Sequence, residues 1–223
     1  MCGKYILAQA AKAERALAIQ RGHWDYPLSY RVLPTESVPV VVAEAQQRAA
    51  AMMRWGLIPW WAHGVPLKAS TINATAERLE SAPAYRDPWR RAQRCIFAMA
   101  GFYEPHLNAD GSRVPYFLRL TEREVFGVAG LWERSRRADG TMVHSCTLIT
   151  VPANELLAEV HNGKPRMPAI LAAADEEAWL QGSVSSARAA LKPYVSGHMT
   201  AHRVSARVNN PRLPNDATLI QPA

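Results

Sequence analysis

The fold is decided by "FGVAGLWERSRRADGTMVHSCTLITV", residues Phe126 to Val151. Two strand-like runs flank Asp139-Gly140, and Asp-Gly between such runs is a strong local signal for a β-hairpin. Upstream, "YEPHLNADGSRVPYFLRL" (Tyr103 to Leu120) repeats the arrangement around Asp110-Gly111. Two successive hairpins predict a mostly antiparallel sheet in the middle of the chain.

The flanking segments add further strands and helices. "CIFAMAGFYEP" (Cys95 to Pro105) is predicted to be one buried strand, and residues 32–44 a turn followed by an apolar strand. Helices are predicted over residues 7–22 and over residues 175–194, the second broken near Gly182. We therefore expect an α+β fold, a single domain over residues 1–223 with a barrel-like, mostly antiparallel β-sheet flanked by helices. A C-terminal tail is expected from about residue 210.

Composition narrows the class of protein. The 223 residues are 48% hydrophobic and 20% charged, which is typical of a globular chain with a substantial core. There is no bilayer-spanning run and no signal-peptide pattern. Three cysteines without close pairing suggest neither a disulfide framework nor a zinc site. We expect a cytoplasmic monomer with no membrane association, metal or cofactor.

The net charge of +7 and a pI of about 9.6 favour an anionic partner, and nucleic acid is the commonest. Lysines and arginines are spread along the chain, so no single patch stands out. The adjacent Trp60 and Trp61 follow a predicted strand, where neighbouring side chains point to opposite faces. At least one is then exposed and could stack on an unpaired base.

Four residues could carry chemistry: Cys2, Asn73, Glu104 and His161. They could supply a nucleophile, a polarising amide and two acid/base groups. Each also has a structural interpretation, since Cys2 could be a small core residue, Asn73 a helix cap, Glu104 an exposed hairpin residue and His161 a satisfied core histidine. If Met1 is removed, Cys2 presents an α-amine and a thiol on one residue. No phosphate-binding loop, zinc-type histidine pair or Gly-x-Ser-x-Gly elbow is present.

The order of several motifs resembles the SOS-response-associated peptidase (SRAP) family of abasic-site-processing proteins. The resemblance extends from Met1 to about Asn209. It rests on these stretches: "MCGKY", "MRWGLIPWW", "INATAERL", "GFYEP", "PYFLRL", "FGVAGLWE", "TLITVPANELLAEVHN" and "RMPAIL".

The resemblance implies a barrel-like domain with a basic groove for single-stranded DNA. It implies loss of Met1 and a thiazolidine crosslink between Cys2 and an abasic sugar, which protects abasic sites in DNA repair and the SOS response. Asn73 would hold and polarise the ring-opened sugar, and Glu104 would act as acid/base in crosslinking and in Met1 release, which makes the protein an autopeptidase. His161 would assist ring opening and reversal, and an abasic-site lyase activity could accompany these steps.

The partner is therefore expected to be single-stranded DNA with abasic sites, which would bring the protein to the nucleoid. Candidate phosphate contacts adjoin the motif residues, and candidate stacking residues follow "MRWGLIP". The full set is Lys4, Arg54, Trp60, Trp61, Arg86, Lys164 and Arg166.

Three departures from the family pattern bear on DNA affinity, and one of them is "AMA" (residues 98–100) before "GFYE", where Pro-Ala-Asp or similar is common. Thr75 stands where an arginine is common, and Pro105 follows "GFYE" where a tryptophan is common. Two other functions stay open from the sequence: a cysteine peptidase that acts on other proteins, with Cys2 as nucleophile and His161 as base, and a single-strand-binding module without chemistry.

Overall fold

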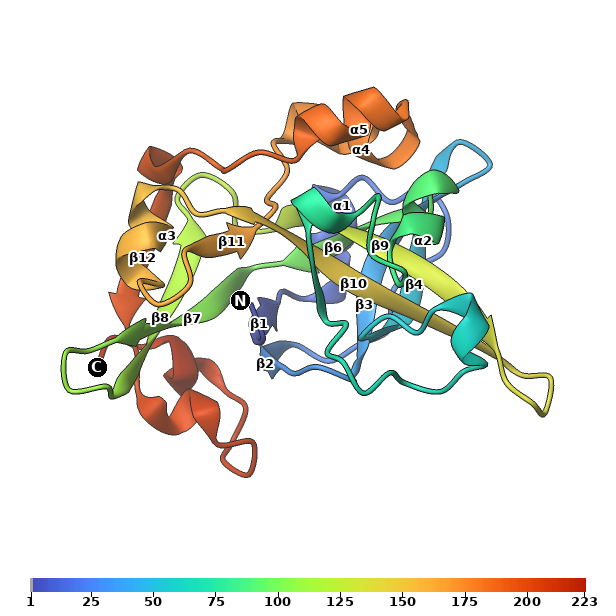
Figure 1. The fold of residues 1–223 in the computed structure, drawn as a ribbon. Coiled ribbons are helices and arrows are strands. Elements are labelled where there is room, and N and C mark those ends of the chain that lie inside the picture. The colour runs from blue at the N-terminus through green and yellow to red at the C-terminus, as the bar shows by residue number, and fades with distance from the viewer. Residues whose placement is uncertain (1) are drawn as a thin grey trace.

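Both predicted hairpins are present in the structure, a computed structural model that describes residues 2–223 (Figure 1). Strands β9 (Phe126–Arg136) and β10 (Met142–Pro152) pair antiparallel, with Met142 opposite Arg136 and Leu148 opposite Gly130. The second predicted hairpin is formed by β7 (Gly101–Leu107) and β8 (Arg113–Leu120). The prediction that Met1 is removed lies outside the described residues.

Five strands close into a barrel. Strand β9 pairs with β6 (Arg94–Met99), β6 with β3 (Ser37–Glu44), and β3 with β4 (Gln47–Trp55). The circle closes because β4 pairs with β10, in parallel, and β10 pairs back onto β9. The interior is filled by side chains such as Trp55 and Phe97, so the barrel is a packed core. The expected α+β fold with a barrel-like sheet is confirmed.

A second, antiparallel sheet lies beside the barrel (Figure 1). Its order is β12-β8-β7-β1-β2. The strands not yet bounded are β1 (Tyr5–Leu7), β2 (Ser29–Val32) and β12 (Met199–Arg203). Strand β1 therefore places the N-terminal segment against β7.

The prediction of one strand over Cys95 to Pro105 is wrong. The run divides at Ala100, so that β6 belongs to the barrel and β7 to the second sheet. The Ala100 N–H donates to the carbonyl of Ile6 at 2.9 Å, which ties the break to the edge of β1. At Gly101, a Cβ would lie 2.3 Å from the Phe117 ring, so only glycine admits this approach.

Short helices and strands cover the sheets. The helix predicted over residues 7–22 is limited to α1 (Ala10–Ala16), because Leu7 is part of β1, and the helix over 175–194 is broken at Gly182 as predicted. Strands β5 (Asn73–Thr75) and β11 (Arg166–Pro168) pair with β10. The remaining α-helices are α2 (Arg86–Arg90), α3 (Glu155–Val160), α4 (Glu176–Gln181) and α5 (Val184–Ala190). The 3-10 helices are η1 (Trp60–Ala62), η2 (Ala76–Arg78), η3 (Ala173–Asp175), η4 (Ser196–His198), η5 (Ala206–Asn209) and η6 (Ala217–Ile220). Within residues 2–223, no helix has the length and apolarity to cross a membrane.

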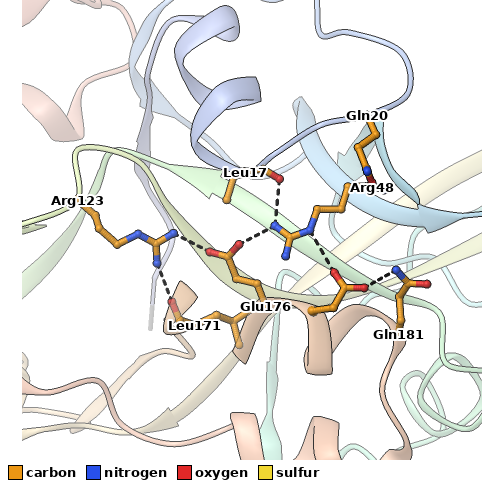
Figure 2. A network of polar contacts seen from close by, with 8 residues as sticks. Leu17, Gln20, Arg48, Arg123, Leu171, Glu176 and Gln181 are labelled. Carbon is orange, nitrogen blue, oxygen red and sulfur yellow. Dashed lines mark hydrogen bonds and ion pairs between the residues drawn. The ribbon is translucent and has the colours of Figure 1, made fainter. Parts of the chain in front are cut away.

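A buried carboxylate joins α4 to the barrel (Figure 2). Glu176 is almost completely buried and accepts hydrogen bonds from Arg48 at 2.8 Å and from Arg123 at 2.6 Å. Arg48 also donates to the carbonyl of Leu17, and Arg123 to that of Leu171. Because each carboxylate oxygen of Glu176 is paired with an arginine, the cost of burying its charge is offset.

Candidate active site around Cys2

Cys2 precedes the first residue of β1, Tyr5, by three positions, and β1 pairs with β7. Tyr5 is opposite Phe102, and the Tyr103 N–H donates to the carbonyl of Lys4 at 3.0 Å. The antiparallel direction carries the residues before Tyr5 along β7 toward Glu104. The Cys2 side chain is fully buried, and its Sγ lies 3.7 Å from the carbonyl oxygen of Lys4. Cys2 is therefore buried, as its interpretation as a small core residue requires, but the polar side chains of Asn73 and Glu104 lie close to it.

Asn73 fixes the backbone of Cys2. It opens β5, opposite Leu148 of β10, and its Nδ2 donates to the Cys2 carbonyl at 2.7 Å. The other side-chain atom, Oδ1, is buried and has no hydrogen-bond partner within residues 2–223. The helix-cap interpretation of Asn73 is wrong, because the nearest helix, η2, begins three residues later, after Thr75.

Glu104 and His161 face each other. The His161 Nδ1 lies 3.6 Å from Glu104 Oε2 and 3.4 Å from the carbonyl of Arg166. Both side chains are buried, so the interpretation of Glu104 as an exposed hairpin residue is wrong. His161 directly follows α3, which begins at the N-cap Asn154, whose side chain accepts from the Leu157 N–H.

The electrostatics of the site follow from burial. Desolvation raises the pKa of Glu104 to about 7, although the nearby Lys4 ammonium opposes this rise. Desolvation, and then the negative charge of Glu104, raise the pKa of the Cys2 thiol. Desolvation lowers the pKa of His161 and of Lys4. A carboxyl group that titrates near neutral pH can both give and accept a proton there.

A cavity of about 270 Å³ opens beside Glu104. Lys4 reaches into it and donates from Nζ to Asn209 Oδ1 of η5. Pro105, one of the departures from the family pattern, forms part of its wall. The lining residues are Lys4, Tyr103, Glu104, Pro105, Arg113, Pro115 and Asn209.

Two residues that sequence reasoning missed join β7 to the end of α3. The Asn162 side chain pairs with both backbone groups of Leu107, accepting from its N–H and donating to its C=O, each at 2.9 Å. The His106 Nδ1 donates to the carbonyls of Glu159 and Val160 at 3.2 Å. Asn162 follows His161 and His106 lies two residues after Glu104, but no spacing rule indicates that they meet.

Some of the basic residues predicted to contact DNA lie near Cys2, and the others lie elsewhere. Lys4 and Arg166 lie at the Cys2 site, and Arg166 is held by a two-pronged ion pair with Glu77 at 2.8 and 2.9 Å. Lys164 is exposed on the loop after His161. Of the others, Arg54 donates to the carbonyl of Gly56 at 2.7 Å and Arg86 is half-exposed beside Asp87.

Trp60 and Trp61 follow β4, as predicted, but they lie in η1, so the alternation of side chains along a strand does not apply to them. Both are exposed, by 50% and 38%, so the expectation that at least one is exposed is confirmed for a different reason. Trp60 belongs to a separate cavity and not to the one beside Glu104.

A metal site is not formed by the described part of the chain. Within residues 2–223, no group of three or more His, Cys, Asp or Glu side chains could hold an ion. Cys95 and Cys146 are fully buried in β6 and β10.

Comparisons with known proteins identify a family and similar structures. The profile of the SOS response associated peptidase (SRAP) family matches residues 1–211. The abasic site processing protein YoqW of Bacillus subtilis (strain 168) is 32% identical over 191 residues, which are 84% of each chain. The abasic site processing protein HMCES of Pongo abelii is 27% identical over 92% of this chain and 68% of its own. A crystal structure of a protein from Bacteroides thetaiotaomicron has a TM-score of 0.83 and 25% identity, and covers 98% of this chain and 99% of its own.

Proposed function

Because the chain belongs to the SOS response associated peptidase (SRAP) family, we propose that it processes abasic sites in single-stranded DNA through a covalent crosslink to Cys2. The named relatives are abasic site processing proteins. The observation that carries the proposal is the meeting of Asn73 with the Cys2 backbone next to the Glu104–His161 pair. These four residues are far apart in sequence and have no other evident reason to share one buried polar site.

The crosslink needs the α-amine of Cys2, which is free once Met1 is removed. An α-amine titrates near pH ~7.7–8.0, so a useful fraction is unprotonated at neutral pH. The amine adds to the aldehyde of the ring-opened sugar, and loss of one water leaves a Schiff base. The thiol sulfur then bonds to the same carbon, its proton is passed on to the nitrogen, and a five-membered thiazolidine ring results.

The neighbouring residues support the proton transfers in this sequence. The raised pKa of the Cys2 thiol keeps it protonated, so a base must take its proton as the C–S bond forms. Glu104, with a pKa of about 7, is suited to protonate the departing hydroxyl, which leaves as water, and then to accept the proton of the thiol. His161 would assist ring opening and reversal, and the Asn73 Oδ1, which has no hydrogen-bond partner within residues 2–223, would accept a hydrogen bond from a sugar hydroxyl.

The same residues support two accompanying activities. Glu104 would also serve as acid/base in release of Met1. The Schiff base would permit β-elimination at the sugar, which gives an abasic-site lyase. Phosphates of the bound strand would be contacted by Lys4, Arg54, Arg86, Lys164 and Arg166, and unpaired bases would stack on Trp60 and Trp61.

The Cys2→Ala variant tests the proposal. Alanine keeps an α-amine after Met1 removal, so it can form the Schiff base but not the thiazolidine. On a denaturing gel with a labelled abasic single strand, the heat-stable crosslink should vanish, and a crosslink should reappear when borohydride reduces the Schiff base. Cys95→Ala, which removes a buried thiol outside the site, should crosslink like the wild type.

Intact mass spectrometry completes the test. The purified protein should lack Met1 and should gain the mass of the abasic strand minus one water. A stable crosslink of Cys2→Ala without borohydride would contradict the assignment, as would full crosslinking by a protein that keeps Met1.

A further inference from the structure

A second cavity, of about 710 Å³, lies where the β9–β10 hairpin leaves the barrel. This distal cavity is defined by Trp60, His63, Arg91, Gln93, Trp132, Glu133, Arg134, Arg136 and Met142. It shares no residue with the cavity beside Glu104. We propose that the distal cavity is a second subsite for single-stranded DNA, which binds a base and its phosphates several nucleotides away from the reacting sugar. The position of this subsite relative to the reacting sugar rests on the function proposed above.

Trp60 is held rigidly with one side free. The fully buried Ser135 donates from its Oγ to the carbonyl of Pro59 at 2.9 Å and accepts from the Gly64 N–H at 2.8 Å, which fixes both ends of the η1 loop. The Trp60 indole N–H donates to Asp87 at 2.9 Å, yet half of the side chain is exposed. An aromatic ring already fixed in place can stack on an unpaired base at little entropic cost.

The hairpin supplies cations beside this ring. Trp132, Arg134 and Arg136 alternate along β9 and therefore share one face of the strand. Both arginines are exposed, and within residues 2–223 their guanidinium groups make no hydrogen bond or ion pair. Arginines free of protein partners beside an exposed aromatic ring fit phosphates next to a stacked base.

A third arginine is oriented by a buried network. Glu133 is almost completely buried and is paired with Arg91, while its other oxygen accepts from Gln93 at 3.3 Å and from the Arg134 N–H at 2.9 Å. Gln93 also accepts from the Arg91 Nε at 2.8 Å. The only carboxylate that lines the distal cavity, within residues 2–223, is thus already paired. The cavity keeps a positive balance and attracts an anion.

The distance to Cys2 follows from strand β10. Met142, at the rim of the distal cavity, is six residues from Leu148, which is opposite Asn73, and Asn73 contacts Cys2. At about 3.3 Å per residue this is roughly 20 Å. Figure 1 shows the segment after η1 running from the hairpin side back toward β1. A strand stacked with the B-form spacing of about 3.4 Å per nucleotide would cross this distance in about six nucleotides, and a more extended strand would cross it in fewer.

Because the distal cavity lies on one side of Cys2, only one end of a bound strand can reach it. The test uses three labelled abasic single strands: one with two nucleotides on both sides of the abasic site, and two with eight nucleotides on the 5′ or the 3′ side alone. Crosslinking rates are measured at subsaturating DNA. Binding of intact dT4 and dT12 is measured by fluorescence anisotropy over a salt series.

The test variant is Arg134→Ala/Arg136→Ala, and its control is Arg15→Ala/Arg119→Ala, which removes the same charge from exposed positions outside both cavities. In the wild type and the control, extension on one side alone should raise the crosslinking rate, and dT12 should bind at least about five-fold tighter than dT4. The test variant should lose both gains and crosslink the short strand at the wild-type rate. Its salt slope for dT12 should fall by about 1.4, the value for two phosphate contacts on a single strand.

Three outcomes would overturn the subsite. In the first, extension on the 5′ side and on the 3′ side raises the crosslinking rate equally. In the second, the test variant and the control show the same dependence of affinity on strand length. In the third, polyglutamate displaces labelled dT12 as well as unlabelled dT12 does. A failure of the proposed function is distinguishable. If no strand is crosslinked but dT12 still binds tighter than dT4 and the test variant alone loses this difference, the subsite stands without the crosslinking chemistry.

Discussion

At the scale of single residues, Glu104 has the most unusual environment in the candidate site. It ends a run of buried residues in β7, and burial raises its pKa to about 7 from an ordinary value of 4.5. Its neighbours are His161, Lys4 and Cys2, so a change in its charge is felt by each group proposed to react. Perturbed carboxyl groups of this kind are typical of acid/base sites.

Glu104→Gln should slow crosslinking by about 10²–10⁴-fold, because the amide keeps the size of the side chain but cannot exchange a proton. The wild-type rate should rise as pH increases through about 7, where Glu104 becomes the base, and the variant should lose this inflection. The measurement is single-turnover crosslinking between pH 5.5 and pH 8.5. Glu159→Gln, an exposed position on α3, should retain the wild-type profile.

The raised pKa of Glu104 also predicts how the free energy of unfolding of the wild type changes with pH relative to Glu104→Gln. The folded protein binds the Glu104 proton more tightly than the unfolded chain does, so wild-type stability should fall as pH rises from about 4.5 to about 7. The loss relative to Glu104→Gln should be on the order of 3 kcal/mol in urea denaturation. A constant difference between the two proteins over this pH range would contradict the raised pKa.

At the scale of elements, the site depends on how α3 is joined to β7. The helix has only six residues, too short to hold His161 in place by itself. The side chain of Asn162 pairs with Leu107 as a neighbouring strand would, and His106 binds the last carbonyls of the helix. His161 is therefore positioned by contacts that flank it on both sides.

Asn162→Ala should slow the His161-dependent steps without changing DNA affinity, since both hydrogen bonds to Leu107 are lost and the imidazole is less well positioned. Each bond contributes about 1 kcal/mol, so the free energy of unfolding should fall by about 1–2 kcal/mol. Crosslinking and its reversal are followed on denaturing gels, and affinity by anisotropy. Asn108→Ala, which removes only a bond to Ser112 in the neighbouring turn, is the matched control. An equal effect of both substitutions would argue against a positioning role.

Gly101→Ala should destabilise the junction between the barrel and the second sheet. The new Cβ would lie 2.3 Å from the Phe117 ring and 2.9 Å from the carbonyl of Leu118, so β7 and β8 would have to separate. Overpacking of this kind costs about 1–3 kcal/mol, which thermal and urea denaturation can measure. Gly197→Ala, with open space around the added methyl group, should change stability little. A Gly101→Ala protein as stable as Gly197→Ala would contradict the close approach.

At the scale of the whole molecule, distant segments are joined by the buried Glu176 (Figure 2). Its carboxylate binds Arg48 of β4 and Arg123 of the connection between β8 and β9, and Arg48 also binds the end of α1 through Leu17. One side chain thus holds together the barrel, the second half of the chain and the N-terminal helix.

Glu176→Ala should lower the free energy of unfolding by about 3–5 kcal/mol, because it leaves two partly buried arginines without their carboxylate. The exposed neighbour Glu177 binds Arg48 from the surface, and Glu177→Ala should cost about 1 kcal/mol or less. Chemical denaturation measures both, and crosslinking under conditions where Glu176→Ala is folded should match the wild type. Equal losses for the two variants would show that burial of the pair has no special effect.

The sequence by itself determined the features that depend on neighbouring residues. Asp-Gly between apolar runs predicted both hairpins, Gly182 predicted the break between α4 and α5, and the motif order indicated the family. The residue types at Cys2, Asn73, Glu104 and His161 pointed to chemistry before any contact was known. Turn residues and side-chain periodicity act within a few residues, so a local pattern is enough to reveal them.

Only the tertiary structure decided where these pieces meet. It divided the run from Cys95 to Pro105 between two sheets, because the Ala100 N–H pairs with Ile6 and Gly101 packs on Phe117. It closed the barrel through the parallel pairing of β4 with β10, two strands about 90 residues apart. It also buried Glu104 beside His161, which is what raises the pKa of the carboxyl group. Desolvation and long-range strand pairing arise from contacts between distant segments, so no local pattern can encode them.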